Sequence, residues 1–85
     1  DPAAVAHSKP APDIFLAAAK GVGADIRRCI GIEDAAAGVA AIKAAGALPI
    51  GVGKAEDLGS DIALVFGTAE LTYAYLQNVW EQSGR

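Results

Sequence analysis

The chain has 85 residues, of which 53% are hydrophobic and 20% charged, which is the composition of one small globular domain and not of a disordered segment. Its formal net charge of −3 and its scattered lysines and arginines argue against a nucleic-acid-binding surface. No apolar run approaches the roughly 20 residues of a membrane span, and a single cysteine excludes an internal disulfide. We therefore expect a cytoplasmic protein that binds neither membrane nor nucleic acid.

Helical and strand patterns alternate in the first half of the chain. Residues 12–23 have apolar side chains at helical spacing and end in glycines, which predicts a helix. Residues 28–33 (RCIGIE) form a short apolar run, typical of a strand that is covered on both faces. Residues 36–46 predict a second helix, with Gly46 as the residue that ends it.

The second half continues this alternation. Residues 48–53 predict another strand, in which Pro49 indicates an edge strand or the start of a strand. Residues 62–66 predict a third strand, and residues 68–82 a final helix with Thr68 as its N-cap. Three side chains at helical spacing are expected to pack this helix onto the sheet: Tyr73, Leu76 and Trp80. The pattern predicts an α/β fold in which parallel strands alternate with helices.

Two adjacent acids, Glu33 and Asp34, follow the first predicted strand. Ligands of parallel sheets bind beyond the carboxyl ends of the strands, which is where these acids are expected. Asp34 could simply cap the next helix, where the helix dipole would favour both acids. A cap needs only one acid, however, and neighbouring carboxylates repel each other unless a cation lies near them. A hard divalent metal ion would account for both.

A second candidate is Lys9, in the segment HSKPAPDIF at residues 7–15. The two prolines of this segment favour an extended backbone around Lys9. An ammonium group held there could neutralise a phosphoryl oxygen or a carboxylate. A solvated surface lysine is the alternative, but the acids one strand later favour a functional role. His7 has no evident acid or cysteine to orient it and is expected to be a surface residue, and Cys29 a small buried hydrophobe.

The segments KPAPDIFLAAAKGVG and CIGIEDAAAGVAAIKAAGALPIGVG resemble the haloacid dehalogenase superfamily of aspartate-nucleophile phosphotransferases. The whole chain, including GALPIGVGKAEDLGSDIAL and NVWEQ, is similar to the C-terminal part of the bacterial β-phosphoglucomutase family within it. The resemblance implies the C-terminal half of a Rossmann-like core with an incomplete sheet. It also implies phosphoryl transfer that interconverts β-D-glucose 1-phosphate and glucose 6-phosphate.

The resemblance also implies roles for single residues. Lys9 matches the catalytic lysine that stabilises charge on the transferring phosphoryl group and on the nucleophilic aspartate. Glu33 and Asp34 match the acids that help hold the Mg²⁺ cofactor. Ala35 stands where the family often has serine, so a hydrogen bond from that hydroxyl to the metal site would be missing.

The family's nucleophile belongs to an Asp-x-Asp motif, which this chain does not contain. We therefore expect residues 1–85 to be the C-terminal portion of a catalytic core domain, without its N-terminal part and helical cap, and to be inactive alone. The expected partners are a sugar phosphate and either the N-terminal half of the enzyme or a second copy at the open sheet edge. The alternatives are a related sugar-phosphate phosphatase and a non-catalytic α/β module that binds a metal or a partner.

Overall fold

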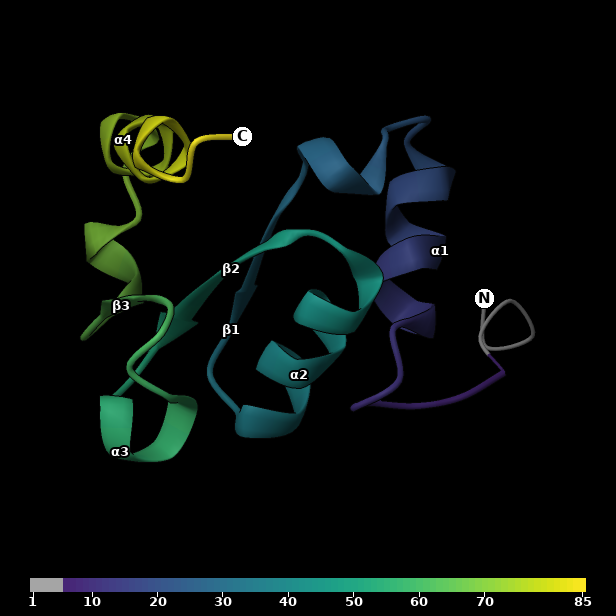
Figure 1. Cartoon of the computed structure of the whole chain (residues 1–85), viewed down its shortest axis with the longest axis horizontal. Coiled ribbons are helices and arrows are strands. Elements are labelled where there is room, and N and C mark those ends of the chain that lie inside the picture. The colour runs from purple at the N-terminus through teal and green to yellow at the C-terminus, as the bar shows by residue number, and fades with distance from the viewer. Residues whose placement is uncertain (1–5) are drawn as a thin grey trace.

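Helices and strands alternate in the computed structural model, which describes residues 6–85 (Figure 1). The elements in chain order are α1 (Asp13–Gly21), the 3-10 helix η2 (Ile26–Arg28), β1 (Ile30–Glu33), α2 (Ala36–Ala45), β2 (Leu48–Val52), α3 (Ala55–Leu58), β3 (Ala63–Val65), the 3-10 helix η3 (Thr68–Glu70) and α4 (Tyr73–Gln82). Within the described residues, no helix is long and apolar enough to cross a bilayer.

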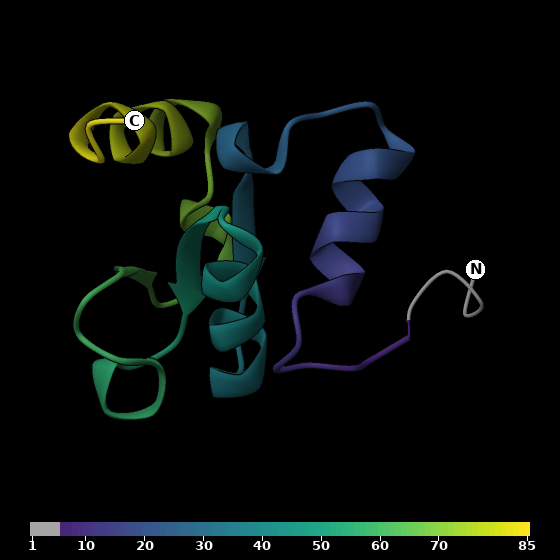
Figure 2. The same cartoon turned by 45° about the vertical axis from the view of Figure 1, so that its right-hand side comes forward.

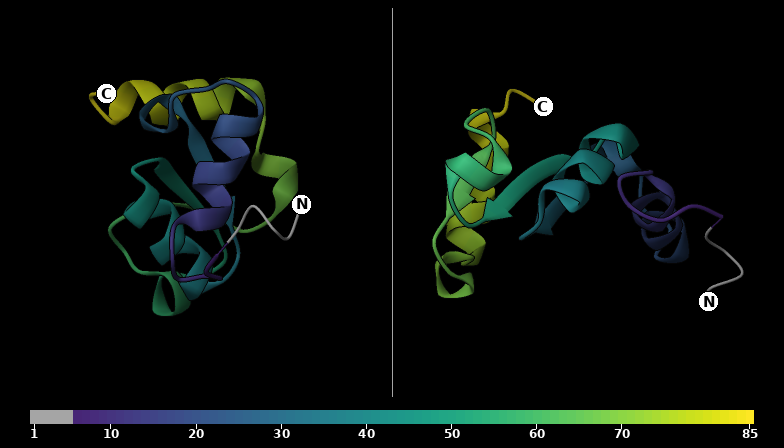
Figure 3. Two further views of the ribbon diagram at one scale, coloured as in Figure 1. Left: turned by 90° about the vertical axis from the view of Figure 1, so that its right-hand side faces the viewer. Right: turned by 90° about the horizontal axis from the view of Figure 1, so that it is seen from below.

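The strands form one parallel sheet in the order β1-β2-β3. Ile50 of β2 pairs with Ile32 of β1 on one side and with Ala63 of β3 on the other. Helices α1 and α4 lie at opposite ends of the longest axis of the molecule (Figures 1 and 2, and Figure 3, right). The predicted α/β class, with parallel strands alternating with helices in an open sheet, is confirmed.

Pro49 lies in the central strand, so the first of the two alternatives, an edge strand, is wrong. The second, the start of a strand, agrees with the structure, since Pro49 is the second residue of β2. The N–H group of Leu48 donates to the Cys29 carbonyl on the β1 side. The ring nitrogen of the next residue therefore faces the β3 side, where pairing begins only at Ile50. A proline is tolerated here because no neighbouring strand needs an N–H donor from it.

Helix α2 covers one face of β1 and β2 and supplies much of the core. Its predicted apolar face is confirmed, since Val39 is 3% exposed and Ile42 is fully buried. The helix ends where predicted, at Gly46, whose φ of 96° lies in the left-handed region that favours glycine. A Cβ on Gly31 of β1 would lie 2.6–2.8 Å from side-chain atoms of Ile42, so this glycine allows α2 to approach the strand closely.

The opposite face of β1 is only partly covered by the described residues. Ile32 points away from Gly31 and Glu33 along the strand and remains 40% exposed. The prediction of a strand covered on both faces is therefore wrong for this part of the chain. The reason is that the described helix packing on β1 is α2, which lies on the Gly31 side, so the Ile32 side keeps part of its surface exposed.

The C-terminal helix differs from the prediction in its start and its packing. Thr68 opens the 3-10 helix η3, whose Glu70 carboxylate accepts hydrogen bonds from the N–H groups of Phe66 and Gly67. The N-cap of α4 is Thr72, whose hydroxyl oxygen accepts from the Tyr75 N–H at 3.1 Å. Tyr73 is 81% exposed and so does not pack on the sheet, whereas Leu76 and Trp80 are half-buried.

These two threonines provide a direct test of where α4 begins. Thr72→Ala is expected to weaken the helix by about 0.5–2 kcal/mol, because it removes the cap of the Tyr75 N–H. Hydrogen exchange at that amide should become faster. Thr68→Ala is the matched control and should leave this exchange unchanged. A larger effect of Thr68→Ala at Tyr75 would mean that the helix begins at the earlier threonine.

Candidate functional site

Lys9 and Glu33 meet at the carboxyl end of β1. The Lys9 Nζ lies 2.5 Å from Glu33 Oε1, although 24 residues separate the two in the sequence. The Lys9 side chain is 39% exposed and that of Glu33 is 14% exposed. The ammonium can therefore still contact a ligand from solvent, while the carboxylate that holds it is largely covered.

The Glu33 side chain lies against the first turn of α2. Gly31 and Glu33 point to the same face of β1, and Gly31 faces Ile42 of that helix. A Cβ on Gly38 would lie within 2.6 Å of Glu33 Cγ, and closer still to its carboxyl group. The carboxylate therefore occupies the space that a side chain at residue 38 would need.

The segment that carries Lys9 forms a turn. The Ala11 N–H donates to the Ser8 carbonyl at 3.0 Å, which closes the turn around Lys9. Proline limits the backbone angles near it, but this hydrogen bond decides how the chain reverses. The Lys9 Nζ also lies 5.8 Å from the centre of the Phe15 ring, within the range of a cation–π contact.

His7 is exposed, as expected, but the prediction that no acid orients it is wrong. Its backbone N–H donates to Asp13 Oδ2 at 3.1 Å, and its Nδ1 lies 3.2 Å from the same oxygen. Asp13 belongs to the first turn of α1. This contact ties the Lys9 turn to α1. Little in the sequence indicates it, because six residues separate the partners and the intervening turn brings them together.

Asp34 is exposed and follows β1 directly. The N-cap position of α2 is held by Ala35, so Asp34 does not cap this helix as the simplest alternative predicted. Both acids still lie just before the N-terminus of α2, whose dipole favours negative charge.

The donor set at this strand end fits Mg²⁺ in chemistry. Carboxylate oxygens are the ligands that Mg²⁺ prefers, and it is often bound by one or two carboxylates together with water and substrate phosphates. Residues 6–85 contain no group of three or more His, Cys, Asp or Glu side chains able to hold a metal ion. Glu33 and Asp34 can therefore supply two of the ligands but not a complete protein cage.

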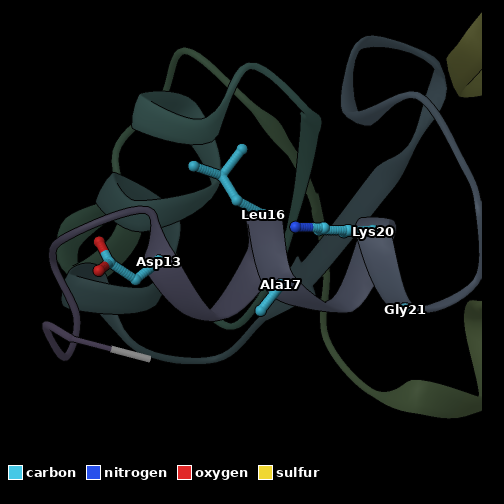
Figure 4. Close-up of a pocket in the computed structure, with 5 residues that line it drawn as sticks. All are labelled: Asp13, Leu16, Ala17, Lys20 and Gly21. Carbon is cyan, nitrogen blue, oxygen red and sulfur yellow. The ribbon is translucent and has the colours of Figure 1, made fainter. Parts of the chain in front are cut away.

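Other polar and concave features do not include Lys9, Glu33 or Asp34. The Lys43 ammonium donates to Asp61 Oδ2 at 2.5 Å, and this hydrogen bond lowers the pKa of the Asp61 carboxyl. Cys29 is half-buried, and its Sγ donates to the Asp25 carbonyl. A surface hollow is lined entirely by residues of α1 (Figure 4), namely Asp13, Leu16, Ala17, Lys20 and Gly21. None of these features brings a second basic group to the Glu33 carboxylate.

Comparison with known families decides the assignment of the chain. A family model described as haloacid dehalogenase-like hydrolase matches residues 1–46, which is more than half of the sequence. The chain belongs to the haloacid dehalogenase-like hydrolases. The family that the Lys9 and Glu33-Asp34 segments resemble is therefore confirmed.

Three members of the haloacid dehalogenase-like family illustrate which proteins this chain is similar to. The chain is 46% identical to β-phosphoglucomutase of Bacillus subtilis (strain 168) over 83 residues, which cover 96% of this chain and 36% of that protein. It superposes on crystalline β-phosphoglucomutase from Clostridium difficile with a TM-score of 0.91 and 38% identity, covering 98% of this chain and 37% of the other. The third relative is a mutant of CbbY from Rhodobacter sphaeroides, crystallised in complex with xylulose-(1,5)bisphosphate. It superposes with a TM-score of 0.69 and 30% identity, and the match covers 79% of this chain and 32% of the other.

The predicted similarity to β-phosphoglucomutase is confirmed by these matches. The chain spans about a third of the length of these relatives. What the sequence did not predict is the direct pairing of Lys9 with Glu33 and the role of Gly38 beneath the carboxylate. Gly38 follows Glu33 by five residues and lies in the first turn of the next helix. This spacing is the feature of the sequence that could have indicated that Gly38 lies near Glu33.

Proposed function

We propose that this chain is the C-terminal portion of the catalytic core domain of a Mg²⁺-dependent, cytoplasmic sugar-phosphate mutase. Its reaction would interconvert β-D-glucose 1-phosphate and glucose 6-phosphate. The observation that supports this proposal is the pairing of Lys9 with Glu33, beside Asp34, at the carboxyl end of β1. The similarity to two β-phosphoglucomutases supports the choice of reaction.

Phosphoryl transfer requires mainly positioning and neutralisation of negative charge. Lys9 would place its ammonium against a phosphoryl oxygen, and its contacts with the Glu33 carboxylate and the Phe15 ring would hold it in position. Asp34, which is exposed, and the second oxygen of Glu33 would help hold Mg²⁺. The bound ion would supply further neutralisation of phosphoryl charge.

The experiment uses the full-length protein that contains this chain. It is incubated with β-D-glucose 1-phosphate in the presence and absence of Mg²⁺, and the products are followed by phosphorus NMR. Conversion to glucose 6-phosphate only with Mg²⁺ is the expected result. Failure to convert the substrate in either condition would contradict the mutase assignment.

A second candidate function is a sugar-phosphate phosphatase of the same family. It is favoured by the similarity to CbbY, which was crystallised with a sugar bisphosphate. Release of inorganic phosphate in place of glucose 6-phosphate would identify this activity in the same experiment. A non-catalytic module that binds a metal or a partner would bind Mg²⁺ or another chain and give neither product.

The open edge of β1 is the proposed contact for the rest of the enzyme. Among the described residues β1 pairs only with β2, and Ile32 leaves an apolar side chain 40% exposed beside that edge. Unpaired edges of this kind recruit further strands. We propose that the N-terminal half of the same protein pairs here, and that a second copy takes its place when that half is absent.

The isolated 85 residues should therefore show no mutase or phosphatase activity with Mg²⁺ and sugar phosphate. They should also be marginally folded or self-associated, because the β1 edge has no partner strand of its own among the described residues. Sedimentation and hydrogen exchange measure association and folding, and a sensitive phosphate-release assay measures the chemistry. A stable monomer with measurable turnover would disprove this prediction, since it would require a nucleophile within these 85 residues.

A further inference from the structure

Strand β1 and helix α2 pack through two contacts of the same kind, each of which places a glycine against a long side chain. Gly31 of β1 faces Ile42 of α2, and Gly38 of α2 faces Glu33 of β1. Residues 31 and 33 lie on one face of the strand, and residues 38 and 42 lie one turn apart on one face of the helix. The first contact is apolar and buried, whereas the second places a charged group at the functional site.

The second contact is closer than any side chain at residue 38 would allow. A Cβ on Gly38 would lie within 2.6 Å of Glu33 Cγ, and the Cδ and Oε1 atoms would be closer still. Separations below 3.0 Å are essentially never found for real Cβ atoms. The overlap involves the carboxyl group itself, so relief requires that the carboxylate move.

Backbone conformation does not explain this glycine. Gly38 lies inside α2, and its φ is outside the left-handed region that only glycine adopts easily. Glycine inside a helix is less favourable than alanine by roughly 0.5–1 kcal/mol. Its presence is explained by the room that it leaves for Glu33.

We propose that Gly38 is a positioning residue, whose missing side chain provides the space in which the Glu33 carboxylate lies and from which it holds Lys9. Any side chain at residue 38 would push the carboxylate out of this space and separate it from the Lys9 ammonium, now 2.5 Å away. The consequence of this positioning for catalysis rests on the proposed function, whereas the contact itself does not.

The test compares Gly38→Ala in two backgrounds of the full-length protein. In the wild-type background the displaced Glu33 side chain loses its contact with Lys9, so Gly38→Ala should raise Tm by less than the better helix propensity of alanine alone would, or lower it. In the Glu33→Ala background the side chain that overlaps is gone, and the same substitution should leave Tm unchanged or raise it. A smaller gain in Tm in the wild-type background than in the Glu33→Ala background is specific to the Gly38–Glu33 contact.

Gly21→Ala is the matched control, because Gly21 is a helical glycine with nothing within 4 Å of the position that a Cβ would take. It should not lower Tm in either background. A Gly38→Ala effect of the same sign and size in both backgrounds would overturn the proposal. If Gly38→Ala alone does not fold, Glu33→Ala must restore folding, and a double variant that also fails to fold would overturn it.

Two further measurements separate positioning from general destabilisation. A crystal structure of the Gly38→Ala variant should show Glu33 displaced and no Lys9–Glu33 ion pair, and an intact pair would contradict the proposal. If the wild-type protein is a mutase, kcat should fall by about 10- to 100-fold, as misplacement of a catalytic group by about 1 Å can produce. KM should change little. A wild-type protein without phosphoryl-transfer activity would disprove the proposed function but leave the difference in Tm between the two backgrounds as a test of Gly38.

Discussion

Neutralising both strand-end acids, by Glu33→Gln together with Asp34→Asn, is expected to abolish the Mg²⁺-dependent activity of the full-length protein. Each substitution keeps the size of the side chain and removes one negative charge. The attraction of a hard cation for its site depends strongly on that charge. Mg²⁺ affinity should fall by at least about 100-fold, the upper range seen when only supporting groups around a metal are lost. Calorimetric titration with Mg²⁺ measures the affinity, and the mutase assay measures the activity.

The chain offers a matched control for this variant in Glu56 and Asp57, a second exposed Glu-Asp pair in α3. Glu56→Gln with Asp57→Asn changes the net charge by the same amount and keeps the same residue order. It should leave Mg²⁺ affinity and activity close to those of the wild type. If the Glu33-Asp34 variant behaved like this control, the assignment of the metal ligands would be wrong.

The order of helices and strands could be predicted because it follows from local patterns. Gly46 ends α2 as expected, since a left-handed residue is needed there and glycine adopts that conformation at little cost. Val39 and Ile42 lie in the core as their helical spacing predicts. These inferences need only neighbouring residues, and so a single sequence is sufficient for them.

The errors concern features that depend on distant parts of the chain. Pro49 left two alternatives open, an edge strand or the start of a strand, and only the pairing register, in which β3 joins at Ile50, excludes the edge strand. Tyr73 has the spacing of a core residue, but α4 begins at that position and leaves the ring 81% exposed. In both cases the surroundings of the residue depend on how distant segments pack, which the local pattern does not specify.

In the candidate site, too, the sequence identified single residues but not the contacts between distant ones. The sequence identified Lys9, Glu33 and Asp34 as residues of interest but assigned the lysine and the glutamate to separate tasks. The structure brings Lys9 and Glu33 into one ion pair, because the Lys9 turn folds back over the end of β1. The room for that carboxylate depends on how closely α2 approaches β1, which is a tertiary distance that the spacing of residues does not specify.

Replacing Lys9 with alanine is expected to lower the rate of phosphoryl transfer in the full-length protein by two or more orders of magnitude. A preorganised electrostatic contact to the reacting group typically contributes about 2.7–4 kcal/mol to the transition state. Stability should hardly change, because the ion pair with Glu33 is partly exposed and such pairs contribute only about 0–1 kcal/mol. Single-turnover rates measure the chemical step, and thermal unfolding measures stability.

Lys20→Ala is the control for the loss of a positive charge, since Lys20 is an exposed lysine in the last turn of α1. Its single-turnover rate should stay near that of the wild type. Lys9→Ala also leaves the Glu33 carboxylate, which is 14% exposed, without its cationic partner. The double variant Lys9→Ala with Glu33→Gln removes that unpaired charge but also a proposed Mg²⁺ ligand, so its rate is compared with that of Glu33→Gln alone. It should be slower than this single variant if the ammonium itself acts on the phosphoryl group. A rate near wild type for Lys9→Ala would identify Lys9 as a solvated surface residue, whereas a double variant no slower than Glu33→Gln alone would mean that Lys9 serves mainly to neutralise Glu33.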